Sequence, residues 1–306
     1  MAVRGGGRRL AALSDEALRH ELARIGPQWA ADIRAGSERV KALYEPWLAA
    51  APRGDVAVHR DLPYGPHPRM VLDVFQPPAA DRAPVIVFVH GGAFVRGDKR
   101  TTPELYDNVL TWFARQGCLG VNVEYRLAPE ARYPAGAQDV GAAVAWLRLN
   151  AGRFGGDPAC IHLVGHSAGG THAAGHVYDP ASGGPSPAVR GLVLISARLR
   201  ADVLPANPNR EGVLAYFGPD PAVHERASPM GHAGPSRVPT LVVTAEYENP
   251  LLDAYGAEFA ARLQASGHPR AEHRVVPGHN HMSIVAHFNT AEETLGRQIL
   301  AFLGIA

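Results

Sequence analysis

The chain has 306 residues, of which 46% are apolar, and a formal net charge of +1. This apolar content can fill a large core, and we expect one domain over residues 1–306. Positive and acidic residues are interspersed, which argues against binding to nucleic acid or to an anionic membrane. No run approaches the roughly 18 apolar residues of a membrane span, and we expect a cytoplasmic protein.

Short β-branched runs alternate with helical patterns along most of the chain. The expected strands span residues 56–64, 71–76, 85–90, 119–125, 161–165, 192–195, 241–244 and 274–276. The expected amphipathic helices span residues 103–116, 137–150, 253–266 and 291–303. From the third strand onward the runs are continuously apolar, which indicates burial on both faces. The pattern predicts an α/β fold with an eight-stranded, mostly parallel, doubly wound sheet.

Two segments interrupt this alternation. Residues 14–48 have a helical pattern before the first strand, with Ser14 placed as an N-cap, and residues 198–237 are rich in Pro, Gly and Asn. Ligands bind beyond the carboxyl ends of the strands in such sheets. We therefore expect both segments to form cap elements over the site. The alternatives are a helix packed on the outside and a surface loop.

A candidate nucleophile lies directly after one apolar strand, in the run Gly165-His166-Ser167-Ala168-Gly169. The G-x-S-x-G pattern is typical of a nucleophile elbow, in which a strand turns sharply into a helix. Small neighbours leave room for the strained corner, and the strain directs the Ser167 hydroxyl into solvent. An ordinary glycine turn that contains a serine is the alternative.

The run His90-Gly91-Gly92-Ala93-Phe94 follows another buried strand. Glycines allow backbone N–H groups to approach the negative charge that develops on a carbonyl oxygen during acyl transfer. We expect an oxyanion hole formed by Gly92 and Ala93 together with Ala168, whose N–H lies at a helix N-terminus. The alternative is a glycine turn that closes the strand. His90 is expected to be structural.

With these motifs the chain resembles the α/β-hydrolase superfamily, and within it the carboxylesterases of the hormone-sensitive-lipase type, from about Val85 to the C-terminus. The segments Glu124-Tyr125-Arg126-Leu127-Ala128-Pro129-Glu130 and Phe154-Gly155-Gly156-Asp157-Pro158 are similar to segments that precede the nucleophile in that family. One departure is that the family usually has a third Gly where Ala93 stands. Ala93-Phe94 looks closer to the feruloyl-esterase-like and kynurenine-formamidase-like branches.

The catalytic residues of this fold occur in the order nucleophile, acid, base, and the base is a late histidine. His279 and His281 both follow the last expected strand. In the family the catalytic histidine commonly stands three residues beyond a glycine, as His281 does beyond Gly278. The resemblance therefore implies His281, with His279 as the alternative. His287 lies in a stretch with a helical pattern and is expected to be structural.

Three carboxylates follow the strand expected at residues 241–244. The family acid stands three residues after a Gly, which is replaced here by Ala245, so the resemblance implies Glu248. A glutamate can also orient the histidine and stabilise its charged form. Glu246 and Asp253 are the alternatives, although Asp253 falls in the first turn of a helix, where the dipole favours a carboxylate.

The remaining histidines and cysteines indicate neither a metal site nor redox chemistry. His172 and His176 have the i, i+4 spacing of metal ligands, but no Glu follows His172 and no third ligand stands out. Cys118 and Cys160 each begin an apolar run and are expected to be small buried side chains. We expect no metal, nucleotide or other cofactor.

The sequence thus predicts a serine hydrolase that cleaves a small carboxylic ester through an acyl-enzyme, with Ser167, His281 and Glu248 as its triad. The alternatives are a hydrolase of aryl formamides or amides that uses the same site, and a ligand-binding protein without turnover. The charges of residues 14–48 favour a soluble substrate over a lipid surface. A homodimer is compatible with the sequence.

Overall fold

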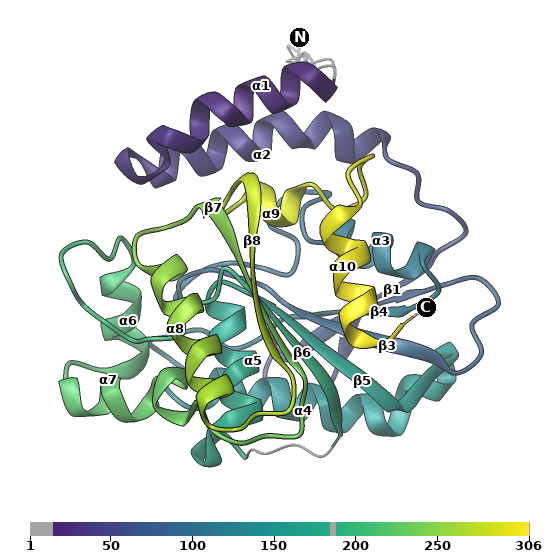
Figure 1. Cartoon of the computed structure of the whole chain (residues 1–306). Coiled ribbons are helices and arrows are strands. Elements are labelled where there is room, and N and C mark those ends of the chain that lie inside the picture. The colour runs from purple at the N-terminus through teal and green to yellow at the C-terminus, as the bar shows by residue number, and fades with distance from the viewer. Residues whose placement is uncertain (1–14, 184–187, 306) are drawn as a thin grey trace, which may run out of the picture.

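The computed structural model describes residues 15–183 and 188–305, so the expected N-cap Ser14 lies outside the described residues. Figure 1 shows a central sheet between layers of helices. The strand order is β1-β2-β4-β3-β5-β6-β7-β8. The strands are β1 Ala57–Pro63, β2 Val71–Gln76, β3 Ala83–Val89, β4 Leu119–Val123, β5 Gly156–His166, β6 Val189–Ile195, β7 Thr240–Tyr247 and β8 Ala271–Asn280.

The first two strands pair antiparallel, β2 also pairs antiparallel with β4, and every other pair of neighbours is parallel. This arrangement confirms the predicted mostly parallel sheet. The α-helices are α1 Asp15–Ile25, α2 Ile33–Ala50, α3 Asp107–Arg115, α4 Ala135–Asn150, α5 Ala168–Tyr178, α6 Arg210–Phe217, α7 Pro221–Ala227, α8 Leu252–Ala265, α9 Ser283–Ala286 and α10 Thr294–Leu303. Short 3-10 helices span η1 Gly26–Ala31, η2 Ala151–Phe154, η3 Pro180–Ser182 and η4 Pro229–His232.

The alternation of side chains along β3 shows how the core forms on both faces of the sheet. Val85 and Val87 lie in an apolar cluster with residues of α4, α5 and α8. Ile86 and Phe88 point to the opposite face and lie in a cluster with residues of α1, α2, α3 and α10. Because successive strand residues face opposite sides, a continuously apolar strand is buried only when helices cover both faces.

The last strand departs from the sequence prediction. Residues 274–276 belong to β8, which is longer than expected, and Val275 is 56% exposed. The expectation of burial on both faces is wrong here because β8 is an edge strand with β7 as its sole neighbour in the sheet of the described residues. The two cysteines were also expected to be buried. Cys118 is buried, whereas Cys160 is only half-buried.

The N-terminal helices lie across the end of the sheet at which β7 and β8 terminate (Figure 1). The close approach occurs at η1, where a Cβ on Gly26 would lie 2.4 Å from the Tyr247 ring at the end of β7. Trp29 Nε1 donates a 2.8 Å hydrogen bond to Asn249 Oδ1, and both side chains are buried. The helical pattern expected for residues 14–48 is thus present, and its role as a cap stays a prediction.

The segment 198–237 contains α6, α7 and η4 and is therefore more regular than its composition indicates. Tyr216 on α6 stacks on Phe94 with ring centroids 5.0 Å apart. A Cβ on Gly212 would lie 2.1 Å from the Ala93 carbonyl oxygen, so α6 packs closely on the loop after β3. Its role as a cap also stays a prediction.

The Trp29 hydrogen bond yields a test of how the N-terminal helices are held. Trp29→Phe removes the donor and leaves the buried Asn249 amide oxygen without it, which should lower the free energy of unfolding by about 1–3 kcal/mol. Trp47→Phe on α2 is the matched control, because Trp47 Nε1 is buried without a partner among the described residues. Urea unfolding of both variants measures the difference, and equal losses would contradict the role assigned to the Trp29 bond.

Candidate active site

The corner between β5 and α5 places Ser167 at the edge of the sheet. Ser167 has φ +55° and ψ −122°, a strained backbone conformation for a residue with a side chain. A Cβ on Gly165 would lie 2.6 Å from Gly170 Cα, and one on Gly169 would lie 2.1 Å from the Val89 carbonyl oxygen. α5 can therefore approach β5 and β3 this closely only because Gly165 and Gly169 carry no Cβ.

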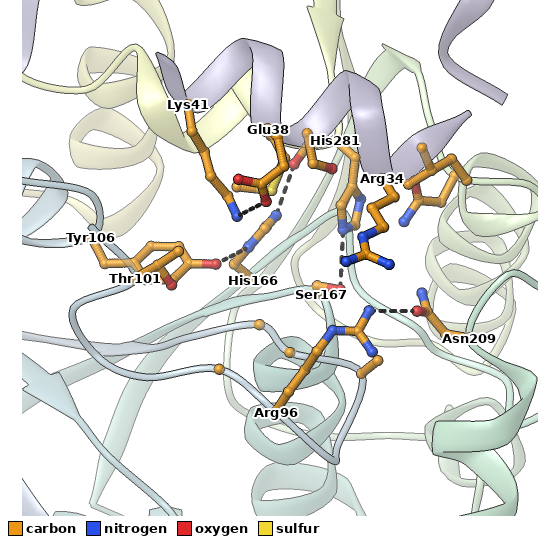
Figure 2. A pocket seen from close by; sticks show the side chains of 18 of the residues that line it. Arg34, Glu38, Lys41, Arg96, Thr101, Tyr106, His166, Ser167, Asn209 and His281 are labelled. Carbon is orange, nitrogen blue, oxygen red and sulfur yellow. Dashed lines mark hydrogen bonds and ion pairs between the residues drawn. The ribbon is translucent and has the colours of Figure 1, made fainter. Parts of the chain in front are cut away.

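The structure brings the three expected triad residues together. His281 Nε2 lies 3.1 Å from Ser167 Oγ, and His281 Nδ1 lies 2.9 Å from Glu248 Oε2. His281 and Glu248 are both buried, while Ser167 is half-buried and lines a cavity. Figure 2 shows the hydrogen bond between His281 and Ser167. A hydroxyl, an imidazole and a carboxylate in such a chain can carry out proton transfer during nucleophilic attack.

Backbone and hydroxyl donors hold the Glu248 carboxylate in place. Its Oε1 accepts hydrogen bonds from the Ala245 N–H at 2.9 Å and from the Ser196 hydroxyl. Its Oε2 accepts from the Asn249 N–H at 3.2 Å as well as facing His281. Both oxygens are thus fixed by the turn after β7 and by the end of β6, which orients the carboxylate toward the imidazole.

The two alternative acids lie elsewhere. Glu246 is exposed, and its Oε2 accepts a 2.7 Å hydrogen bond from the Gly278 N–H. It therefore ties the end of β7 to the last residues of β8, just before His281. Asp253 is exposed in the first turn of α8, the place expected from the sequence.

The two other late histidines have structural partners. His279 Nδ1 lies 3.0 Å from Ser283 Oγ, and His279 Nε2 lies 3.0 Å from Glu292 Oε1. The hydrogen bond from His279 lowers the pKa of Glu292 to about 2. His287 is buried and follows α9 immediately instead of lying within a helix, and its Nδ1 lies 3.0 Å from the carbonyl oxygen of Ser283, the first residue of that short helix.

The loop after β3 turns tightly beside Ser167. Gly92 has φ +145°, and a Cβ there would lie 1.8 Å from the Arg96 carbonyl oxygen, so glycine is required. Ala93 follows with φ +51°. Over residues 15–183 and 188–305, the N–H groups of Gly92 and Ala93 have no protein acceptor. Ala168, the third expected donor, begins α5, and the role of all three as an oxyanion hole stays a prediction.

His90, expected to be structural, is fully buried in this loop and lies 3.1 Å from Glu124 Oε1. Burial raises the pKa of Glu124, but the hydrogen bonds from His90 and from the Lys99 N–H outweigh it and leave this pKa below its ordinary value. Arg69 also contacts the Glu124 carboxylate. The Glu124 segment thus anchors both ends of the glycine loop.

Sequence reasoning gave no role to His166, although it precedes Ser167 in the motif. His166 Nε2 lies 2.9 Å from the carbonyl oxygen of His281, and Nδ1 lies 3.3 Å from the Tyr106 hydroxyl. Because a carbonyl only accepts, Nε2 carries the proton and Nδ1 accepts from Tyr106. Burial holds the pKa of His166 well below its ordinary value, which keeps this arrangement neutral. A histidine inside the G-x-S-x-G motif was the available signal.

A cavity of about 880 Å³ opens over Ser167 and His281. Its walls come from α2, the loop after β3, the Pro208–Asn209 turn and the loops that follow β7 and β8. Several basic side chains face it, among them Arg34, Lys41 and Arg96 (Figure 2). Residues of α2 thus line this cavity, and none of these cations was identified from the sequence.

Within the described residues, no group of three His, Cys, Asp or Glu side chains is placed to hold a metal ion. His172 lies buried against the rings of Phe94, Tyr125 and Tyr216, and His176 is buried in α5. No helix within residues 15–183 and 188–305 combines the length and the apolar character needed to cross a membrane.

Comparison with known proteins agrees with the fold described above. The model of a family described as alpha/beta hydrolase fold matches residues 86–285. The chain is similar to the esterase LipQ of Mycobacterium tuberculosis, with 27% identity over 88% of this chain and 67% of LipQ. It is 32% identical to the carboxylesterase NlhH of the same organism, over 63% of this chain and 65% of NlhH. It thus spans about two thirds of the length of both relatives.

Among solved structures, an esterase from Pyrobaculum calidifontis is similar to the chain with a TM-score of 0.72 and 26% sequence identity. The match covers 96% of this chain and all of the other. The likeness therefore extends over the N-terminal helices as well as the sheet.

The buried histidines make the free energy of unfolding depend on pH. Burial lowers the pKa of His176 to about 4, against about 6.5 in an unfolded chain, so the unfolded state binds the proton first as pH falls. Stability is therefore lost from about pH 6.5 downward, by about 2 kcal/mol at pH 5 from this residue. His176→Leu should reduce the loss between pH 7.5 and pH 5 by that amount in urea unfolding. Comparing the two pH values within each protein cancels any packing cost, and an unchanged loss would contradict the argument.

Proposed function

The chain belongs to the α/β-hydrolase fold family and is a carboxylic ester hydrolase, and we propose that it cleaves its ester through an acyl-enzyme formed on Ser167. The observation that carries this proposal is the hydrogen-bonded chain Ser167, His281 and Glu248 at the base of a cavity. The names of the similar proteins, esterase and carboxylesterase, support the same chemistry.

In the first half of the proposed reaction, Ser167 Oγ attacks the acyl carbon of the ester while His281 Nε2 takes the hydroxyl proton. Glu248 faces Nδ1 of the imidazole, so it keeps the proton there and stabilises the positive charge that His281 acquires. His281 then gives its proton to the oxygen of the departing alcohol. The acyl group remains on Ser167.

The negative charge of the tetrahedral intermediate is proposed to lie against the N–H groups of Gly92, Ala93 and Ala168. Two of these donors lie on the tight loop after β3, and the third lies at the first residue of α5, whose dipole favours an anion. Because the backbone holds these donors in advance, they need no rearrangement when the charge develops.

Water completes the proposed cycle. His281 removes a proton from a water molecule that attacks the acyl carbon, and the Ser167 oxygen leaves with that proton. The same groups could hydrolyse an aryl formamide or another amide, for which His281 would protonate a nitrogen leaving group. Ala93 stands where the family usually has a third glycine, and Ala93-Phe94 resembles the kynurenine-formamidase-like branch. Hydrolysis of a formamide is therefore the second candidate activity.

We also propose that residues 14–48 and 198–237 act as caps that shape the substrate cavity. The support is that Ile33, Ser37 and other residues of α2 line this cavity, as do Pro208 and Asn209. α6 further packs on Phe94 beside the oxyanion loop.

The Ser167→Ala variant tests the nucleophile. Its kcat/KM for p-nitrophenyl butyrate should fall by at least about 10³-fold, because within the described residues no other hydroxyl lies at hydrogen-bond distance from the His281 ring. N-formyl-aryl amines assayed in parallel decide between ester and formamide cleavage. Circular dichroism and thermal unfolding check that the fold is retained. Activity of the folded variant near the wild-type level would refute the proposed mechanism.

The choice of acid is tested by paired amide substitutions. Glu248→Gln keeps the shape of the side chain but removes the charge beside His281, so kcat should fall by about 10³- to 10⁴-fold. Glu246→Gln makes the same change two residues earlier on an exposed side chain and should retain kcat within about threefold. The reverse ranking of the two variants would identify Glu246 as the acid.

A further inference from the structure

The cavity over Ser167 carries more positive than negative charge. Its lining contains the basic side chains Arg34, Lys41, Arg96 and Arg100, against the carboxylates of Glu38 and Asp98. The whole chain has a formal net charge of only +1, so this excess is a local feature of the site. Charge in a cleft with protein walls acts strongly on a ligand because field lines are concentrated there.

Two of the four cations have carboxylate partners. Lys41 Nζ lies 2.9 Å from Glu38 Oε1 on the same helix, and an Nη atom of Arg100 lies 3.5 Å from Asp61 Oδ2. These pairs neutralise much of the charge at that side of the cavity. Glu38 and Asp61 are thus already paired with Lys41 and Arg100.

Arg34 and Arg96 have no such partner. In the part of the chain that the structure describes, no ion pair or hydrogen bond is formed by the Arg34 side chain. Arg96 Nη2 donates a 3.1 Å hydrogen bond to Asn209 Oδ1, and this bond positions the guanidinium. The Asn209 amide is uncharged, so it does not neutralise the positive charge of Arg96. Both guanidinium groups are therefore available to an anion.

The two arginines approach the reaction centre from opposite walls. Figure 2 shows Arg34 extending from α2 and Arg96 extending from the loop after β3, both toward the part of the cavity where Ser167 and His281 meet. All four residues line the same cavity. An anion held by both guanidinium groups would thus be attached close to the ester carbonyl.

The remaining lining carboxylate, Asp98, opposes this field. It lies two residues after Arg96, and its Oδ1 accepts a 2.9 Å hydrogen bond from the Arg100 N–H, which directs it toward its own loop. Asp98 has no ion pair among the described residues. It should therefore weaken anion binding without abolishing it.

We propose that the substrate of this hydrolase is an anionic ester, with a carboxylate near the scissile bond that is bound by Arg34 and Arg96. A guanidinium fork matches the two oxygens of a carboxylate, and such charge-assisted bonds are stronger than neutral ones. This inference rests on the proposed ester hydrolysis at Ser167 and adds the substrate class. The carboxylate can belong to the acyl or to the alcohol part, and the experiment separates the two.

The experiment compares matched neutral and anionic esters. The acyl arm uses the mono-p-nitrophenyl ester of glutaric acid against p-nitrophenyl valerate, and the alcohol arm uses 3-carboxyphenyl butyrate against 3-carbamoylphenyl butyrate. In one arm, kcat/KM for the anionic ester should exceed that for the neutral ester by about tenfold or more at low salt. The arm that shows the preference identifies the part of the substrate that bears the carboxylate.

Variants then assign the preference to the two arginines. Arg34→Gln and Arg96→Gln should each lower the anionic-to-neutral ratio of kcat/KM about tenfold, mainly through KM, and Arg34→Lys should retain part of it. Asp98→Asn should raise the ratio. Arg39→Gln is the matched control, because Arg39 lies on the same helix but pairs with Glu21 outside the cavity, and it should keep the wild-type ratio.

Salt supplies a readout that a merely structural role would not move. Raising NaCl from about 20 mM to about 500 mM should lower the ratio several-fold in the wild type and leave it unchanged in the Arg34→Gln/Arg96→Gln double variant. A wild-type ratio near one in both arms, or a ratio unaffected by the double variant, would overturn the anionic substrate. Because neutral esters are assayed throughout, their cleavage by wild type and not by Ser167→Ala would show that the ester hydrolase proposal still stands.

Discussion

The approach of α5 to the end of β3 determines the geometry of the site. Gly169 lies so close to the backbone of Val89 that a single Cβ would reach its carbonyl oxygen at 2.1 Å. This contact brings the first turn of α5 against the end of β3, and a Cβ on Gly91 in the loop that follows would lie 3.0 Å from Ser167 Cβ. The chain turns at Ser167 beside this contact, so the hydroxyl and the proposed backbone donors lie at one closely packed corner.

The strained backbone of Ser167 persists because the surrounding sheet is rigid. β5 pairs in parallel with β3 on one side and with β6 on the other, so its end has no freedom to relax. The Ser167 N–H donates to the Ile195 carbonyl at 3.0 Å, which extends the pairing with β6 through the corner itself. The cost of the strain is therefore offset by the hydrogen bonds of the central strands, and the serine stays exposed to the cavity.

The central strands and the two glycine motifs could be predicted from the sequence because their signals are local. A continuously apolar run such as the one in β3 requires cover on both faces, and the motif around Ser167 requires a tight corner. The exposure of Val275 could not be predicted, since it depends on β8 lying at the edge of the sheet. The partner of His166 and the position of Arg34 in the cavity could not be predicted either, because they depend on segments distant in sequence.

The N-terminal helices are connected to the acid of the site through one residue. Asn249 accepts the hydrogen bond of Trp29 with its side chain, donates to Glu248 Oε2 with its backbone N–H, and lines the cavity. The position of η1, and with it the start of α2, is thus fixed against the turn that orients Glu248. Arg34 lies in the first turn of α2. The cavity wall that carries Arg34 and the Glu248 carboxylate that faces His281 are therefore both held in place by Asn249. A displacement of the wall would reach Glu248 through Asn249, so the proposed substrate positioning by Arg34 and the proposed proton transfer by His281 would depend on a shared support.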